Sequence, residues 1–88
     1  MVVDDEPDIT LALRLGLESQ GFQVDAFNDP TEALSNFRSD LYDLLLLDIK
    51  IPSMNGYELY DEMKKIDDKV KICFLTAFET CYDEFKRL

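Results

Sequence analysis

The feature of the sequence that most constrains the fold is a run of four leucines, Leu44–Leu47, with an aspartate on either side. A strand that is apolar on both faces is typical of a parallel sheet that helices cover on both sides. The run is also far shorter than the ~20 apolar residues that a membrane-spanning helix needs. It therefore predicts a buried strand in an α/β domain that does not cross a membrane.

Short apolar runs alternate with amphipathic segments along the chain, without a repeat, a low-complexity tract or a linker. This alternation is typical of β-α-β units, in which parallel neighbours are joined by right-handed helical crossovers. We therefore expect one domain over residues 1–88, with a doubly wound parallel sheet. The expected strands lie at 1–3, 22–26, 44–47 and 72–76, and each is followed by a helix.

Local signals indicate where the helices begin and end. Gly21 ends the first helix, and Asp29-Pro30, with Glu32, supplies a capping-box-like start for a second helix that runs to about Ser39. Asn55-Gly56 opens the third helix. The side chains expected on the inward faces of the third and fourth helices are Leu59, Met63 and Ile66, and Phe78, Tyr82 and Phe85.

Three aspartates stand at the carboxyl ends of two predicted strands: Asp4 and Asp5 follow the first, and Asp48 follows the third. Ligands of open α/β sheets bind beyond these ends, where the strand order reverses. Carboxylates ~4 Å apart repel by about 4 kcal/mol at an effective dielectric of 20, so the cluster must take up protons or a cation. An all-oxygen pocket favours Mg²⁺.

The composition narrows the classes of function. A net charge of −10, from nineteen acidic and nine basic residues, argues against a nucleic-acid-binding surface, which needs clustered Lys and Arg. The chain has no histidine, and Cys73 and Cys81 lack C-x-x-C spacing, so the usual zinc-binding combinations are absent. With no signal pattern at the N-terminus, we expect a cytoplasmic protein.

Three segments carry a resemblance to a known family. Residues 2–7 read Val-Val-Asp-Asp-Glu-Pro, residues 42–56 read Tyr-Asp-Leu-Leu-Leu-Leu-Asp-Ile-Lys-Ile-Pro-Ser-Met-Asn-Gly, and residues 75–77 read Leu-Thr-Ala. They resemble the acidic first strand, the phosphoacceptor strand with its following loop, and the fourth-strand hydroxyl of receiver domains in two-component response regulators. The resemblance implies a flavodoxin-like topology with strand order 2-1-3-4.

Carried over position by position, the resemblance implies that Asp48 is the phosphoacceptor. Asp5, Asp48 and the backbone carbonyl of Lys50 would bind Mg²⁺ directly, and Asp4 would bind it through a water molecule. Thr76 would be the switch hydroxyl, which hydrogen-bonds the acyl phosphate. Such a domain catalyses only its own phosphotransfer and dephosphorylation, so we do not expect an enzyme that acts on other substrates.

The resemblance also implies partners. A histidine kinase, a phosphotransfer protein or a small phosphodonor would supply the phosphoryl group. An output domain or a downstream protein would respond to the phosphorylated state through the face that contains the fourth helix.

The family has a fifth strand with a phosphoryl-contacting lysine, followed by a proline and a fifth helix, and residues 1–88 contain no match to them. Lys86 is not this lysine, because it falls within the predicted fourth helix. We therefore expect a receiver domain that is incomplete at its C-terminal end by roughly 25–30 residues. An uncovered sheet edge and helix face would favour dimerisation.

Two other functions remain open at this point. One is a receiver-like interaction module that is not phosphorylated. The other is a Mg²⁺-dependent phosphatase of the haloacid-dehalogenase type, whose D-x-D-x-T motif the first strand does not match. Single residues have simpler explanations too: Glu6 and Asp8 complement a helix dipole, Asn55-Gly56 caps a helix, Thr76 is a β-branched strand residue, and the aromatic residues of the last helix pack inward.

Overall fold

Four parallel strands form the sheet within residues 1–51 and 53–75, which the computed structural model describes. In chain order they are β1 (Val2–Val3), β2 (Ala26–Phe27), β3 (Leu44–Leu47) and β4 (Lys71–Phe74). In space they lie in the order β2-β1-β3-β4, and every neighbouring pair is parallel. The predicted parallel sheet and its strand order 2-1-3-4 are confirmed.

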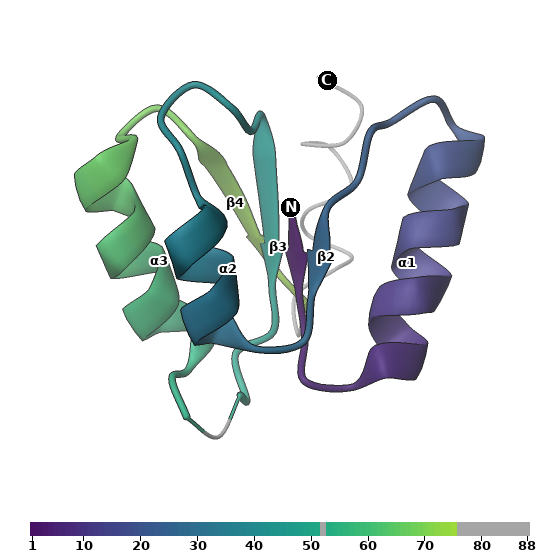
Figure 1. Ribbon diagram of the computed structural model, residues 1–88, viewed down its shortest axis with the longest axis horizontal. Helices are drawn as coiled ribbons and strands as arrows, with labels where there is room; N and C mark the ends of the chain where they lie inside the picture. Colours follow the sequence, from purple (N-terminus) through teal and green to yellow (C-terminus); the bar gives the residue numbers. More distant parts are fainter. Residues whose placement is uncertain (52, 76–88) are drawn as a thin grey trace.

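Within the described part of the chain, three helices cover the sheet on both faces (Figure 1). Helix α1 (Pro7–Ser19) lies on one face, and α2 (Pro30–Asn36) and α3 (Gly56–Ile66) lie together on the other. Each helix connects two parallel strands, which is the doubly wound arrangement that the alternating pattern predicts.

The four leucines of β3 are all buried, at 9% exposure or less. Successive side chains of a strand point to opposite faces, so the run contributes to two cores at once. Leu45 and Leu47 pack in the cluster with α2 and α3, whereas Leu44 and Leu46 pack in a smaller cluster on the face of α1. The prediction of a strand buried on both faces is confirmed.

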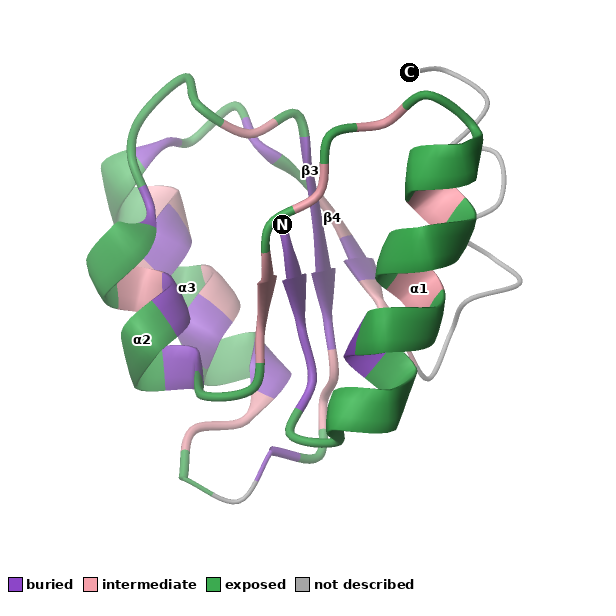
Figure 2. Ribbon diagram, turned by 45° about the vertical axis from the view of Figure 1, so that its right-hand side comes forward, coloured by how far each residue is buried: buried purple, intermediate pink, exposed green. Residues whose placement is uncertain are grey.

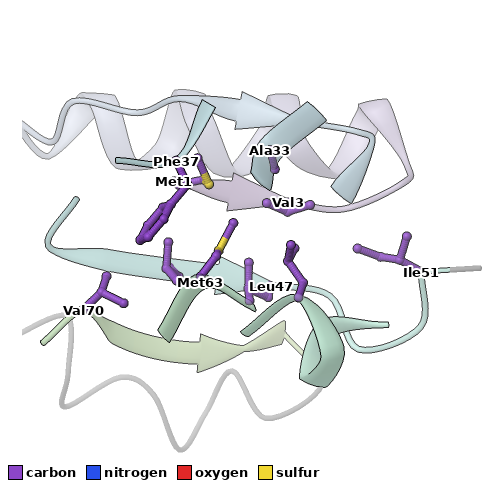
Figure 3. Close-up of a cluster of buried hydrophobic side chains, with 10 residues drawn as sticks. Met1, Val3, Ala33, Phe37, Leu47, Ile51, Met63 and Val70 are labelled. Atoms are coloured by element: carbon purple, nitrogen blue, oxygen red, sulfur yellow. The ribbon is translucent and has the colours of Figure 1, made fainter. Parts of the chain in front are cut away.

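The larger core lies between the sheet and the α2/α3 layer (Figure 3). Both helices turn buried side chains toward the strands, and the loops before and after the strands add further apolar groups. The buried members of this cluster are Met1, Val3, Ala33, Phe37, Leu45, Leu47, Ile51, Leu59, Met63 and Val70.

The opposite face, under α1, has a thinner core. Its buried cluster consists of Val2, Leu44, Leu46 and Cys73, and helix α1 adds only the half-buried Leu13 and Leu17. Figure 2 shows that most of α1 is exposed, in contrast to the strands beside it. Cys73 packs in the interior, and Cys81 lies outside the described residues.

Helix α2 ends at Asn36, three residues before the predicted end at Ser39. Phe37 leaves the helix with an extended backbone (φ −74°, ψ 135°), is only 2% exposed and stacks on Tyr42, with ring centroids 5.8 Å apart. Burying this ring takes the chain out of the helix. Asp40 then adopts a left-handed conformation, with φ of 64°.

Two further predictions are corrected. Ile66 was expected to face inward but is 43% exposed, because Asp67 takes the buried position and accepts hydrogen bonds from the backbone N–H groups of Asp40 and Lys69. The second strand was expected over 22–26, but only Ala26–Phe27 pairs, because β1 brings just two residues to this ladder.

Several predictions concern positions beyond the part of the chain that the structure describes. They are the fourth helix, with Phe78, Tyr82, Phe85 and Lys86, and the switch hydroxyl of Thr76. Over residues 1–51 and 53–75, no helix has the length and apolar character that a membrane span requires.

Candidate functional site

The carboxyl ends of β1 and β3 lie side by side, at the lower edge of the sheet in Figure 1. The register pairs Val3 with Leu47, so Asp4 and Asp48 are the next residues on the two neighbouring strands. The Asp48 N–H donates to the Val3 carbonyl oxygen at 2.9 Å, which extends the backbone ladder up to the acidic residues.

Three carboxylates meet at this edge, as the sequence predicts. One oxygen each from Asp4, Asp5 and Asp48 lies within 4.8 Å of the others, so that the three could share one cation. The three side chains differ in burial: Asp4 is 3% exposed, Asp48 is half-buried and Asp5 is exposed. The cluster therefore has an interior side and a side open to solvent.

Asp4 is the interior member of the cluster. Burial raises the pKa of its carboxyl, and the carboxylate of Asp48 raises it further. A hydrogen bond of 2.9 Å from the Glu6 backbone N–H to Asp4 Oδ1 acts against this rise. A bound cation would relieve the same repulsion, because opposite charge favours the ionised form of a carboxyl.

The loop after β3 holds Asp48 in place. Its Oδ1 accepts a hydrogen bond of 3.1 Å from the Lys50 backbone N–H, which turns the chain directly after the strand. Gly56, the first residue of α3, packs against this turn: a Cβ at Gly56 would lie 2.6 Å from the Asp48 carbonyl oxygen. The glycine is therefore required for the close approach of α3 to the site, beyond the capping role expected for Asn55-Gly56.

Asn55 does cap α3, as predicted, because its side-chain oxygen accepts from the Glu58 N–H at 2.9 Å. Asp29 likewise caps α2, accepting from the Thr31 N–H at 2.9 Å. These caps set the starts of the helices that follow β2 and β3.

An open pocket of about 490 Å³ adjoins the carboxylates. One side of it is polar, with the three aspartates, Glu6 and Lys50, and the other side is apolar. The apolar lining residues are Ile9, Leu13 and Leu75. A small anionic group could enter this pocket and reach Asp48 if a cation offset the negative charge.

The structure adds two residues that the sequence reasoning missed. Asn28, in the loop after β2, donates through Nδ2 to the Asp4 carbonyl oxygen at 2.8 Å and to Thr10 Oγ1 at 3.0 Å. Asn28 does follow the second strand directly, so the rule that selected the aspartates could also have selected it. Thr10 carries no such signal, because it looks like any polar residue of an amphipathic helix.

A doubly wound parallel sheet with a carboxylate-lined pocket at its switch point has the arrangement in which open α/β domains bind their ligands. The model of the response regulator receiver domain matches residues 1–87, and the chain belongs to this family. The transcriptional regulatory protein PcoR of Escherichia coli is 30% identical over 88 residues. That match covers the whole of this chain but only 39% of PcoR.

Solved structures give the same family. The response regulator TrrA of Thermotoga maritima, in complex with Mg²⁺-BeF, is 41% identical over 81% of this chain and 62% of its own, with a TM-score of 0.74. TrrA in complex with the histidine kinase ThkA is 40% identical, with a TM-score of 0.75, over 83% of this chain and 63% of the matched chain. The flavodoxin-like receiver fold implied by the resemblance is thereby confirmed.

Proposed function

We propose that this domain accepts a phosphoryl group on Asp48, in a reaction that requires Mg²⁺. The observation that carries the proposal is the meeting of three carboxylates, from two separate loops, within 4.8 Å at the switch point of the sheet. Membership of the receiver family supports the same role for this site. The complex of TrrA with Mg²⁺-BeF fits this chemistry.

The residues present suit Mg²⁺. The donors are all oxygens, and the half-buried Asp48 and exposed Asp5 leave room on the open side for waters and a phosphate oxygen. Asp5, Asp48 and the Lys50 carbonyl would be direct ligands, and the more deeply set Asp4 would act through a water molecule. When bound, the ion supplies positive charge that offsets the charge on the phosphoryl oxygens.

Asp48 supplies the nucleophile. Because Oδ1 accepts the Lys50 N–H, we assign the attack to Oδ2. A bond forms from this oxygen to phosphorus while the bond from phosphorus to the donor breaks, and the donor leaves with the electron pair. An ionised carboxylate has no proton to lose, so the step needs no general base.

The wider role follows from the same assignment. The phosphoryl group would come from a histidine kinase, a phosphotransfer protein or a small phosphodonor, and the complex of TrrA with ThkA supports the first. Thr76 would sense the acyl phosphate, and an output domain or a downstream protein would respond. The domain would catalyse only its own phosphorylation and dephosphorylation, in the cytoplasm.

Acetyl phosphate and Mg²⁺, followed by phosphate-affinity electrophoresis, test the assignment. We expect the intact chain to be labelled, Asp48→Asn to be unlabelled, and labelling to disappear when EDTA removes the metal. Asp43→Asn is the matched control, since Asp43 is an exposed aspartate just before the same strand. Equal labelling of the wild type and Asp48→Asn would falsify the phosphoacceptor assignment. A wild type that is never labelled would favour the unphosphorylated interaction module.

A further inference from the structure

Asn28 connects the loop after β2 to the acidic loop after β1. Its Nδ2 donates to the Asp4 carbonyl oxygen at 2.8 Å and to Thr10 Oγ1 at 3.0 Å. Thr10 Oγ1 in turn donates to the Pro7 carbonyl oxygen at 3.0 Å. Asn28, directly after β2, is thus hydrogen-bonded both to the residue that follows β1 and to the first turn of α1.

The hydrogen bond from Asn28 to the Asp4 carbonyl lies just beyond the last backbone hydrogen bond between β1 and β2. The Asp4 N–H still donates to the Phe27 carbonyl oxygen, at 3.1 Å, and Phe27 is the last residue of β2. The Asp4 carbonyl lies one step further along. There the side-chain amide of Asn28 supplies the donor, so that the polar contact between the two strands extends to the residue that carries the buried carboxylate.

Asp4 is therefore held at its carboxylate and its carbonyl as well as at its N–H. Its carboxylate accepts the Glu6 N–H at 2.9 Å, and its carbonyl accepts the Asn28 amide. Thr10, which orients that amide, is 5% exposed and is the buried residue of α1. The peptide that joins Asp4 to Asp5 cannot rotate without breaking the bond to Asn28, and this peptide sets the direction in which the Asp5 side chain leaves the backbone.

We infer that Asn28 is a positioning residue of the acidic site: through the Asp4 carbonyl it fixes the turn that presents Asp4 and Asp5 to the metal. The inference rests on the proposed function, in which these carboxylates serve Mg²⁺. Loss of an outer partner of a metal ligand typically weakens metal binding by 10–100-fold. Because Asn28 acts through the backbone, the lower end of that range, about 10-fold, is expected.

The test is a Mg²⁺ titration of the intact chain, followed through the amide NMR signals of Asp5 and Glu6. We expect Asn28→Ala to bind Mg²⁺ about 10-fold more weakly than the wild type. Asn36→Ala is the matched control: the Asn36 amide also donates to a backbone carbonyl, that of Glu32 at 2.8 Å, but within α2. Its Mg²⁺ affinity should equal that of the wild type.

Asn28→Asp separates positioning from simple electrostatics. An added carboxylate near the site would by charge alone tighten cation binding. An ionised carboxylate cannot donate to the Asp4 carbonyl, so positioning predicts weaker binding, at least as weak as in Asn28→Ala. In the metal-free protein, the Glu6 amide of Asn28→Ala should exchange hydrogen faster than in the wild type, while the amides of Leu45–Leu47 keep their protection. If Asn28 only stabilised the fold as a whole, hydrogen exchange would become faster both at Glu6 and at Leu45–Leu47.

Equal Mg²⁺ affinity of the wild type and Asn28→Ala, or tighter binding by Asn28→Asp, overturns the inference and leaves the proposed function intact. A wild type that binds no Mg²⁺ overturns the proposed metal site and the inference with it. If Asn28→Ala does not fold, Thr10→Val is the test, because it removes the acceptor that orients the amide at nearly constant shape. It should bind Mg²⁺ about threefold more weakly, and unchanged affinity would refute the positioning role.

Discussion

The two faces of the sheet are built differently. On one face, α2, α3 and the residue directly after α2 bury four side chains against the strands, each at 2% exposure or less: Ala33, Phe37, Leu59 and Met63. On the other face, α1 leaves Ile9, Leu11 and Leu15 between 38% and 58% exposed (Figure 2). Within the described residues, the α2/α3 face is held by apolar packing, whereas α1 is tied at its start by the polar contacts of Thr10.

The acidic site lies where these two halves meet. Asp48 leads into the loop before α3, on the well-packed face, while Asp4 and Asp5 lead into α1, on the sparsely packed face. Deep burial gives one half of the site a rigid frame. The other half contains the buried Asp4, but α1 packs on it with few buried apolar side chains, and hydrogen bonds at the start of the helix hold the turn in place.

The largest loss of stability is expected for a substitution on the α2/α3 face. Phe37→Ala removes a ring that is 2% exposed and stacked on Tyr42, and it should lower the free energy of unfolding by about 3–5 kcal/mol. Urea denaturation followed by circular dichroism measures it. A loss below about 1 kcal/mol would mean that this face is not the main source of stability.

A pair of glycines contrasts the two regions directly. Gly56→Ala places a Cβ 2.6 Å from the Asp48 carbonyl oxygen, so we expect a loss of about 1–3 kcal/mol and weaker Mg²⁺ binding. Gly16→Ala, in the middle of α1, meets nothing within 4 Å and should instead stabilise the domain by about 0.5–1 kcal/mol. Thermal unfolding of both variants tests the contrast, and the same sign for both would contradict it.

A smaller effect on stability is expected at Asp67, which directly follows α3. The backbone N–H groups of Asp40 and Lys69 hold the pKa of its carboxyl below the ordinary value. A carboxyl with a lowered folded-state pKa stabilises the fold above its unfolded-state pKa, and this contribution is lost as the pH falls through the folded value.

Asp67→Asn should therefore be less stable than the wild type at pH 7, and the difference should shrink as the pH falls below 3.8, the ordinary Asp value. Urea midpoints of both proteins across this range measure the difference. Asp68→Asn, an exposed neighbour, is the control. A difference that does not change with pH would exclude the ionised carboxylate as its source.

The smallest effect is expected on the exposed side of α1. Leu15 is 58% exposed, so Leu15→Gln should change the free energy of unfolding by no more than about 0.5 kcal/mol. A loss of about 2 kcal/mol or more would show that this face is covered in the intact chain, and the contrast between the two faces would then need revision.

Much of the fold could be predicted because short sequence patterns, in β3 and in the aspartates after β1 and β3, indicate how distant segments pack together. Four consecutive leucines indicate burial on both faces, and parallel strands bring Asp4 and Asp48 to one edge wherever they stand in the sequence. The prediction that Ile66 faces inward was wrong because helical periodicity considers only apolar side chains. The polar side chain of Asp67 takes the buried place and accepts hydrogen bonds from two backbone N–H groups.

The position of Asn28 after β2 makes it a candidate by the same rule as the aspartates, but its hydrogen bond was not predicted, for a related reason. Its partner, Asp4, is 24 residues away, and no spacing rule encodes a hydrogen bond between a side chain and a distant carbonyl. The end of α2 was set too late because the stacking of Phe37 on Tyr42 is a tertiary contact that outweighs local helix preference. In each case a contact between distant segments decided the local conformation.

The uniform leucine run of β3 has a further consequence. Shifting a strand by one residue exchanges its two faces, but four identical side chains fill either face equally well. Apolar packing thus says little about where this strand sits along its neighbours. The aspartates at its two ends fix this position, because a shift in either direction would bring Asp43 or Asp48 into the interior, where an unpaired charge is costly. Asp48, the proposed phosphoacceptor, therefore also helps to set the register of the central strand.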